Sequence, residues 1–74
     1  MARETTLDAR DVDPHALLDR VLTAVRGFDR DDRLRILTEY EPVALYPIFE
    51  RNNFGHRLEV GEGSVFVLTL WLKG

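Results

Sequence analysis

The chain contains no cysteine among its 74 residues. This absence excludes disulfides, thiolate metal sites, redox thiols and thiol nucleophiles. Long apolar runs are also missing, since no stretch approaches the roughly 18 residues that a membrane-spanning helix needs. The start of the chain, residues 1–4, is polar and shows no signal-peptide pattern. We therefore expect a cytoplasmic protein that does not enter a membrane.

A strong charge of one sign is missing too. The chain has 10 basic and 13 acidic residues, which give a net charge of −3, whereas nucleic-acid-binding domains usually carry a basic stripe. The arginines between residues 26 and 33 alternate with Asp29, Asp31 and Asp32, so we expect their electric fields to cancel largely. This pattern predicts no binding to nucleic acid.

The length predicts one domain, residues 1–74, with a single core. A chain of this size buries only about 60% of the surface that its unfolded form exposes, which leaves no room for a deep internal active site. Its 45% hydrophobic and 31% charged residues are typical of globular proteins.

The first half of the chain predicts a strand, a helix and a second strand. Residues 5–10 have the pattern of a strand. Asp13 and Pro14 then mark a helix start, because aspartate caps free N–H groups and proline suits the first helical position. Residues 33–38 follow a charged turn and predict the second strand. This close linkage favours a parallel crossover.

The helix between these strands has an apolar stripe at i, i+3, i+4 and i+7 spacing. The stripe consists of Leu18, Val21, Leu22 and Val25, and it is widened by Leu17 and Phe28. We expect Gly27 to end the helix in the left-handed conformation, which would let Phe28 fold back on Leu22.

The second helix is predicted to be short or broken. An acid–proline start recurs at residues 41–42, but Pro47 lies inside the segment and would disrupt a regular helix. We predict a tight turn over residues 43–45 and then a helix to about Asn52.

Residues 56–60 and 64–73 predict a terminal hairpin across a turn at residues 61–63. The last strand is apolar on both faces: Phe66, Leu68, Leu70 and Leu72 line one face, and Val65, Val67, Thr69 and Trp71 line the other. A strand of this kind is normally central in its sheet. The elements thus follow the order β-α-β-α-β-β and predict a two-layer α/β sandwich.

Two short helices can cover only one face of a four-stranded sheet. The uncovered face is expected to show Leu37, Val65, Val67, Thr69 and Trp71. Contiguous apolar surface usually marks an interface, here a homodimer contact or a docking surface for a protein partner. Alternatively, charged side chains lay their aliphatic stems across this face and keep it solvated; those side chains are Arg33, Arg35, Arg57 and Glu59.

A second candidate site lies at the start of the first helix. Asp8, Arg10, Asp13 and His15 are expected to converge there, where exposed N–H groups favour anions. The alternative is structural. Asp13 then caps the helix and His15 is solvated, while Asp8 pairs with Arg10 or with a loop amide.

No set of residues has the spacing that catalysis or metal binding needs. His15 and His56 lie on different elements, which is weak support for a metal or haem. Glu39 and Glu41 are placed to stabilise a helix dipole, and Ser64 has no neighbouring base. We therefore expect neither an enzyme nor a resident cofactor.

Two runs, LDARDVDP at residues 7–14 and LRILTEYEP at residues 34–42, resemble the TusA/SirA-like sulfur-carrier superfamily. The similarity extends from Thr5 to Trp71, and it is greatest to a cysteine-free branch of small bacterial and archaeal domains of unknown function. In that branch an acid–proline pair precedes Leu-Tyr and an aromatic helix; the matching residues here are Glu41-Pro42, Leu45-Tyr46 and Phe49.

The resemblance implies a mixed sheet in the order 1-2-4-3, with the last strand antiparallel and two helices on one face. Sulfur carriers hold a persulfide on a cysteine at the start of the first helix. Asp13, Pro14 and His15 stand there in this chain, so persulfide transfer is excluded. Relatives often occur beside hemerythrin-like or nitrogen-oxide-metabolism proteins, which implies an accessory or sensing role. We add Glu41 to the candidate ligand-binding residues.

Two functions remain open. The first is a non-enzymatic accessory or regulatory module that binds a protein partner, or a second copy of itself, through the uncovered sheet face. The alternative is a small-ligand, metal or haem sensor that uses Asp8, Arg10 and His15. Changes at Trp71 or Val67 should abolish association in the first case, whereas Arg10→Ala or His15→Ala should abolish ligand binding in the second.

Overall fold

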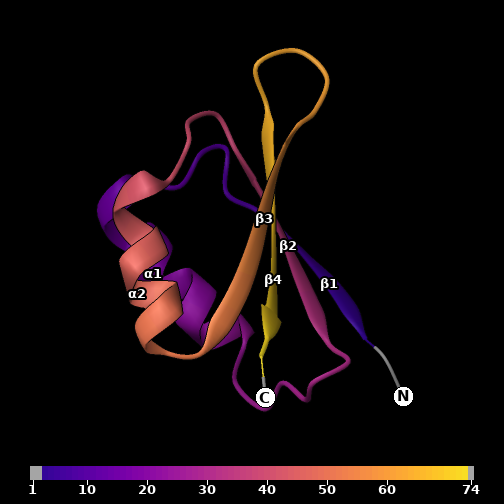
Figure 1. Cartoon of the computed structure of the whole chain (residues 1–74). Helices are drawn as coiled ribbons and strands as arrows, with labels where there is room; N and C mark the ends of the chain where they lie inside the picture. The colour runs from indigo at the N-terminus through magenta and orange to yellow at the C-terminus, as the bar shows by residue number, and fades with distance from the viewer. Residues whose placement is uncertain (1–2, 74) are drawn as a thin grey trace.

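The computed structural model describes residues 3–73 as a sheet with two helices on one of its faces (Figure 1). The elements are β1 (Glu4–Asp8), α1 (Pro14–Ala24), β2 (Arg33–Thr38), the 3₁₀ turn η1 (Val43–Leu45), α2 (Tyr46–Arg51), β3 (Phe54–Val60) and β4 (Phe66–Leu72). The predicted order of strands and helices and the two-layer α/β fold are confirmed.

The strand order in the sheet is β1-β2-β4-β3. β1 runs parallel to β2, and β4 runs antiparallel to both β2 and β3. This is the mixed sheet predicted from the sequence. The strand that is apolar on both faces, β4, lies in the interior of the sheet, because an edge position would expose more of its apolar side chains to water.

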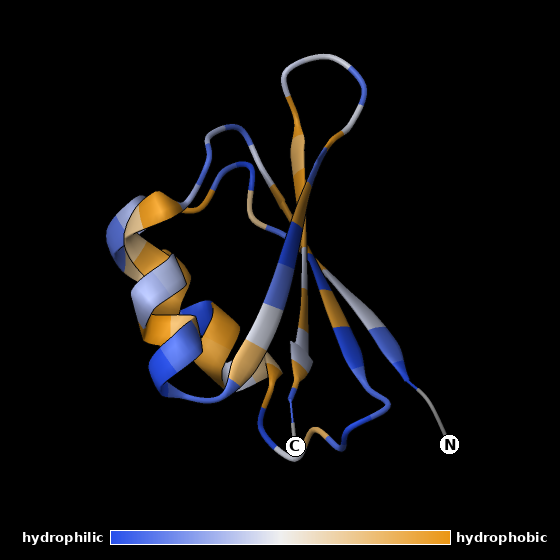
Figure 2. Ribbon diagram, viewed as in Figure 1, coloured by the Kyte–Doolittle hydropathy of each residue, from blue (hydrophilic) through white to orange (hydrophobic). Residues whose placement is uncertain are grey.

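The pairing register sorts the side chains into a covered face and an open face. Leu34 lies opposite Leu70, and Ile36 lies opposite Leu68; all four are completely buried beneath the helices. The intervening β2 residues alternate to the other side, as the polar and apolar colours along β2 show (Figure 2). Period-two alternation therefore decides which half of each strand enters the core.

Helix α1 begins as predicted. The Asp13 carboxylate accepts a hydrogen bond from the His15 backbone N–H at 2.8 Å, and Pro14 occupies the first turn. The helix ends at Ala24, three residues before Gly27, although Gly27 does adopt a positive φ of 77°. At the start of the helix, the Asp13 carboxylate thus pairs with one free backbone N–H, and Pro14 has no N–H that would need a partner.

The apolar stripe of α1 is centred differently from the prediction. Leu17 and Val21 are each 1% exposed, whereas Leu22 is 38% exposed. Phe28 is buried in the core cluster, to which Leu22 does not belong. The expected packing of Phe28 on Leu22 is therefore replaced by packing of Phe28 in the core between the helix and the sheet.

The second half matches the predicted broken helix, with η1 leading into α2. Asn53 then adopts a left-handed φ of 65°, a conformation that asparagine tolerates better than most residues. This turn lets β3 begin at Phe54, two residues before the predicted start. β1 and β4 are each shorter than their predicted strands.

Within residues 3–73, no helix is both long and apolar enough to span a membrane.

Candidate functional site

The open face of the sheet contains the side chains that point away from the helices. Register places three residues of each strand on it: Glu4, Thr6 and Asp8; Arg33, Arg35 and Leu37; Gly55, Arg57 and Glu59; and Val67, Thr69 and Trp71. Val65 precedes β4 on the same side. No helix lies over this face (Figure 1).

The five residues predicted for an interface are together on or beside this face. Each of them is partly buried rather than freely exposed, and these residues are Leu37, Val65, Val67, Thr69 and Trp71. Charged residues of the flanking strands lie in register with three of them: Arg33 with Trp71, Arg35 and Arg57 with Thr69, and Glu59 with Val67. The open face is therefore a patch of apolar side chains set between charged ones.

Trp71 is the largest side chain on the open face, and it lies flat on a glycine. Gly55 is its partner on β3, and a Cβ atom at that position would lie 2.4 Å from the indole ring. On the other side, the Arg33 guanidinium lies 5.7 Å from the ring centroid, within the range of a cation–π interaction. This contact joins the guanidinium of one of the four charged residues named for this face, Arg33, to Trp71.

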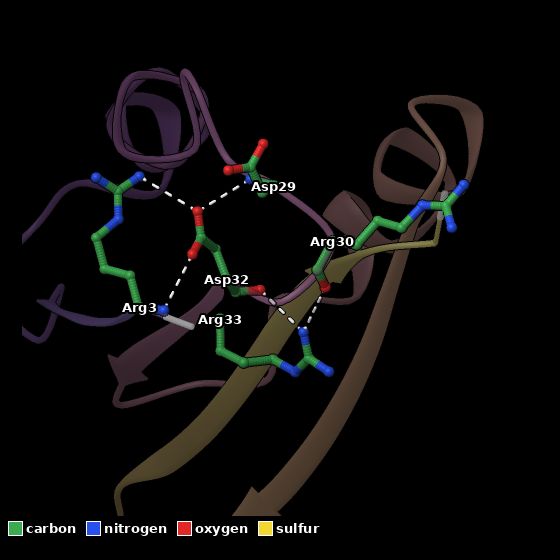
Figure 3. A network of polar contacts seen from close by, with 5 residues as sticks. All are labelled: Arg3, Asp29, Arg30, Asp32 and Arg33. Carbon is green, nitrogen blue, oxygen red and sulfur yellow. Dashed lines mark hydrogen bonds and ion pairs between the residues drawn. The ribbon is translucent and has the colours of Figure 1, made fainter. Parts of the chain in front are cut away.

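A hydrogen-bond network holds Arg33 in this position (Figure 3). Its Nη1 donates to the carbonyl oxygens of Arg30 at 2.9 Å and Asp32 at 3.0 Å. The Asp32 side chain is buried and accepts from the backbone N–H groups of Asp29 and Arg3. The first of these bonds is the main cause that lowers the pKa of Asp32.

Neighbouring charges in the sequence are therefore separated in space. The carboxylate of Asp32 faces Arg3 and the turn, whereas the guanidinium of Arg33 faces Trp71. Arg35 lies on the same face, 3.8 Å from a carboxylate oxygen of Glu4, and Arg57 flanks it across β4. Of the arginines on the open face, only Arg33 comes from the stretch of alternating charges between residues 26 and 33.

Asp8 and Arg10 form a bidentate ion pair near the end of β1. The Arg10 Nη2 and Nε atoms lie 2.7 and 2.9 Å from the two carboxylate oxygens of Asp8. The Arg10 side chain and then its backbone N–H lower the pKa of Asp8 to about 2. Both side chains are about half exposed, 49% and 52%, so solvent screens their attraction.

The other predicted ligand-binding residues have separate partners. Asp13 caps α1, and His15 is exposed in the first turn. Glu41 accepts a hydrogen bond from the Tyr46 hydroxyl at 3.2 Å. Three separate local interactions thus involve these predicted residues: Asp8 with Arg10, Asp13 with the backbone of His15, and Glu41 with Tyr46. They lie around the loops that follow β1 and β2. These contacts agree with the structural alternative for the start of the first helix.

Two shallow clefts lie near these loops. One has a volume of about 400 Å³ and is polar; it is lined by Arg10, Asp11, Glu39, Ser64 and Val65. The other has a volume of about 330 Å³ and is mainly apolar; it is lined by Pro14, Tyr40, Glu41, Pro42, Val43, Ala44 and Leu45. The polar cleft has the Ser64 hydroxyl and the carboxylates of Asp11 and Glu39 in its lining, whereas the apolar cleft has one carboxylate, that of Glu41.

Aromatic residues near the second cleft were not predicted as a group. His56 stacks on Tyr46 with ring centroids 4.4 Å apart, so its ring has a packing role. The Tyr40 hydroxyl is buried without a hydrogen-bond partner within residues 3–73, and burial is the main cause that raises the pKa of Tyr40. No cluster of three or more metal-ligating side chains occurs in this described part.

The fold and the site define a small two-layer α/β domain whose sheet is open on one side. A family model described as uncharacterized conserved protein (DUF2249) matches residues 6–71, and the chain belongs to this family. No curated protein and no solved structure matched the chain.

Proposed function

We propose that this protein is a non-enzymatic accessory module that docks a protein partner through the open face of its sheet. One observation carries the proposal: the interior strand β4 is apolar on both faces, and the helices cover only one of them. We further propose that the domain is a relative of the TusA/SirA-like sulfur carriers that lacks their cysteine.

The size of the open face indicates the strength of docking. Four strands of five to seven residues, spaced about 4.8 Å apart with about 3.3 Å per residue, present roughly 400 Å² to a partner. A contact of this size, counted on both partners, belongs to the class of weak or transient interfaces. We therefore expect reversible association in the micromolar range.

The test compares two lysine substitutions at partly exposed apolar residues. Trp71→Lys places a charge on the open face, and Leu22→Lys places one on α1, where Leu22 is 38% exposed. Each variant and the native chain is used to capture partners from the native cell for mass spectrometry, and sedimentation velocity at micromolar concentration measures association with each partner found. Partners should be retained by the native chain and by Leu22→Lys but lost with Trp71→Lys.

Trp71 also packs against Gly55, so its replacement could affect folding. Thr69→Lys provides a second open-face variant, because Thr69 lies at the centre of this face without making that contact. Circular dichroism verifies that each variant is folded. A partner that binds all four proteins equally would show that docking does not use the open face.

The alternative function, a small-ligand, metal or haem sensor, has one observation in its favour: the polar cleft beside Arg10. Arg10→Ala and His15→Ala should abolish ligand binding under this alternative and leave partner docking unchanged. Elemental analysis and absorption spectroscopy of protein purified from the native cell provide the readout. A retained metal or haem that Arg10→Ala removes would favour the sensor.

A further inference from the structure

We infer that the partner presents a carboxylate-rich segment to the part of the open face around Thr69 and Trp71. The inference rests on the proposed docking function and specifies the chemistry of the partner. Its basis is the arrangement of arginines that the pairing register produces on this face. Arg35 and Arg57 would contact the acidic segment, and Trp71 would pack beside it.

Arg35 and Arg57 lie on either side of Thr69, one on β2 and one on β3. Because adjacent strands are about 4.8 Å apart, the two side chains start about 10 Å apart on the same row. Both are exposed. Arg35 has Glu4 at 3.8 Å, and no ion pair of Arg57 is found within residues 3–73. A single carboxylate-bearing strand crossing this row can reach both guanidinium groups.

The charge on the open face is unevenly distributed, and the face as a whole is neutral, because its three arginines are matched by Glu4, Asp8 and Glu59. The two rows that contain Thr69 and Trp71 have three arginines and one glutamate, a net charge of +2. The whole chain has a net charge of −3, so the remainder has −5. The next row has Asp8 and Glu59 at its two ends. An acidic segment should therefore bind above the rows that contain Thr69 and Trp71. The row that contains Asp8 and Glu59 should repel it.

A second copy of the chain fits this face poorly. A two-fold axis through Thr69 that runs along or across the strands would place Arg35 and Arg57 against arginines of the second copy, because a two-fold contact pairs a surface with itself. Like charges placed opposite each other are unfavourable across an interface. The homodimer expected as one possibility from the sequence is thus disfavoured relative to a different, acidic protein.

Nucleic acid also fits less well than an acidic protein. Strong binding to a nucleic acid requires several phosphate contacts and exposed aromatic faces on which bases stack. Among the residues that the register places on the open face, only Trp71 is aromatic, and it already lies between Gly55 and Arg33. The net charge of −5 on the remaining surface would repel an extended polyanion.

The experiment titrates the ¹⁵N-labelled full chain with three probes and follows amide shifts by NMR at low salt. The probes are an acetylated peptide of alternating glutamate and leucine, the same peptide with lysine for glutamate, and a twelve-residue oligothymidylate. The glutamate peptide should shift amides of β2, β3 and β4, and the lysine peptide should not. Tighter binding of the oligothymidylate than of the glutamate peptide would overturn the inference.

A charge-matched pair of double variants tests the arginines. Arg35→Glu/Arg57→Glu reverses the row beside Thr69, and Arg20→Glu/Arg51→Glu reverses two exposed arginines of the helix layer. The overall charge changes equally in both. The first variant should bind the glutamate peptide about tenfold more weakly, since it loses two charge-assisted contacts, and the second should bind as the native chain does. Equal weakening would refute the inference.

Failure of this inference is distinguishable from failure of the proposed function. A cellular partner that is lost with Trp71→Lys but retained by Arg35→Glu/Arg57→Glu would preserve docking on the open face and refute the acidic partner. A partner that is insensitive to Trp71→Lys would refute docking on this face, whatever the peptide titration shows.

Discussion

The two faces of β4 differ in burial although their residues alternate along one strand. Leu68 and Leu70 are fully buried under the helices, whereas Val67, Thr69 and Trp71 are partly exposed. Hydrophobicity alone does not distinguish Leu68 from its neighbour Val67. The difference teaches that cover by the helix layer, rather than the character of the residue, decides which side of this strand belongs to the core.

The neighbours of the two faces differ as well. On the covered face, Leu68 and Leu70 pair with aliphatic residues of β2. On the open face, Trp71 pairs with Arg33, and Thr69 pairs with Arg35. The covered face is thus stabilised by burial of apolar surface, while the open face combines apolar and charged side chains, a mixture that suits reversible contact.

The largest expected effect is at the covered face. Leu68→Ala should lower the free energy of unfolding by about 2–5 kcal/mol, because it removes a fully buried side chain and leaves a cavity. Val67→Ala, one position away on the open face, should cost about 1 kcal/mol or less, because part of its surface is already exposed. Urea unfolding followed by circular dichroism measures both.

A second, milder variant keeps the comparison measurable if Leu68→Ala does not fold, because small domains are marginally stable. Ile36→Val, at the paired position on β2, is the milder variant, with an expected cost of about 0.5–1.5 kcal/mol. If Val67→Ala lowered the free energy of unfolding as much as the substitutions at the covered positions do, the two faces would not differ in their contribution to stability.

An intermediate effect is expected at Gly55, on which Trp71 lies. Gly55→Ala places a methyl group 2.4 Å from the indole, so the ring must move, at a cost of about 1–3 kcal/mol. The tryptophan emission should shift to longer wavelength as the ring becomes more solvated. Gly61→Ala is the control, because the nearest atoms to its added Cβ lie 3.4 Å away and its φ is not positive, unlike that of Gly63; it should leave the emission unchanged.

The smallest effect concerns the ion pair at the edge of the open face. Because the folded pKa of Asp8 is about 2, below the ordinary value of 3.8, the pair contributes stability above pH 3.8. This contribution is lost as the pH falls from 3.8 toward 2. In Arg10→Ala the pKa of Asp8 should rise toward 3.8, as carbon-detected NMR of the carboxyl group would show.

Screening by solvent keeps this contribution small, since both side chains are about half exposed. Added salt should therefore reduce the difference in pKa between the native chain and Arg10→Ala. A pKa of Asp8 that is the same in both proteins would show that Arg10 does not hold the carboxylate.

Local patterns in the sequence predicted most of the fold. The Asp13 cap, the Arg33–Thr38 strand and the broken second helix follow from residue types within a few positions of one another. The start of β3 was missed because Asn53 takes a left-handed conformation, which the sequence permits without requiring. The exposure of Leu22 was missed because a wide apolar stripe does not show where its centre meets the sheet.

The candidate site was less predictable. The sequence indicated which apolar residues share a face, because alternation along a strand is a local property. It could not show that Trp71 lies on Gly55 or that Arg35 and Arg57 flank Thr69, because these contacts depend on the exact register of the last hairpin and on the pairing of β4 with the distant strand β2. It also grouped Asp8 and Arg10 with Asp13 and His15, which the structure places in separate interactions.

By itself, the sequence determined the elements, their order and the two apolar faces of β4, since helix caps, turns and period-two alternation depend on short-range chemistry. Only the tertiary structure decided which face the helices cover and which charges meet on the other. Strand pairing and helix packing depend on contacts across the whole chain, and those contacts placed Arg33 against Trp71, and Arg35 and Arg57 beside Thr69, on one face of an acidic protein.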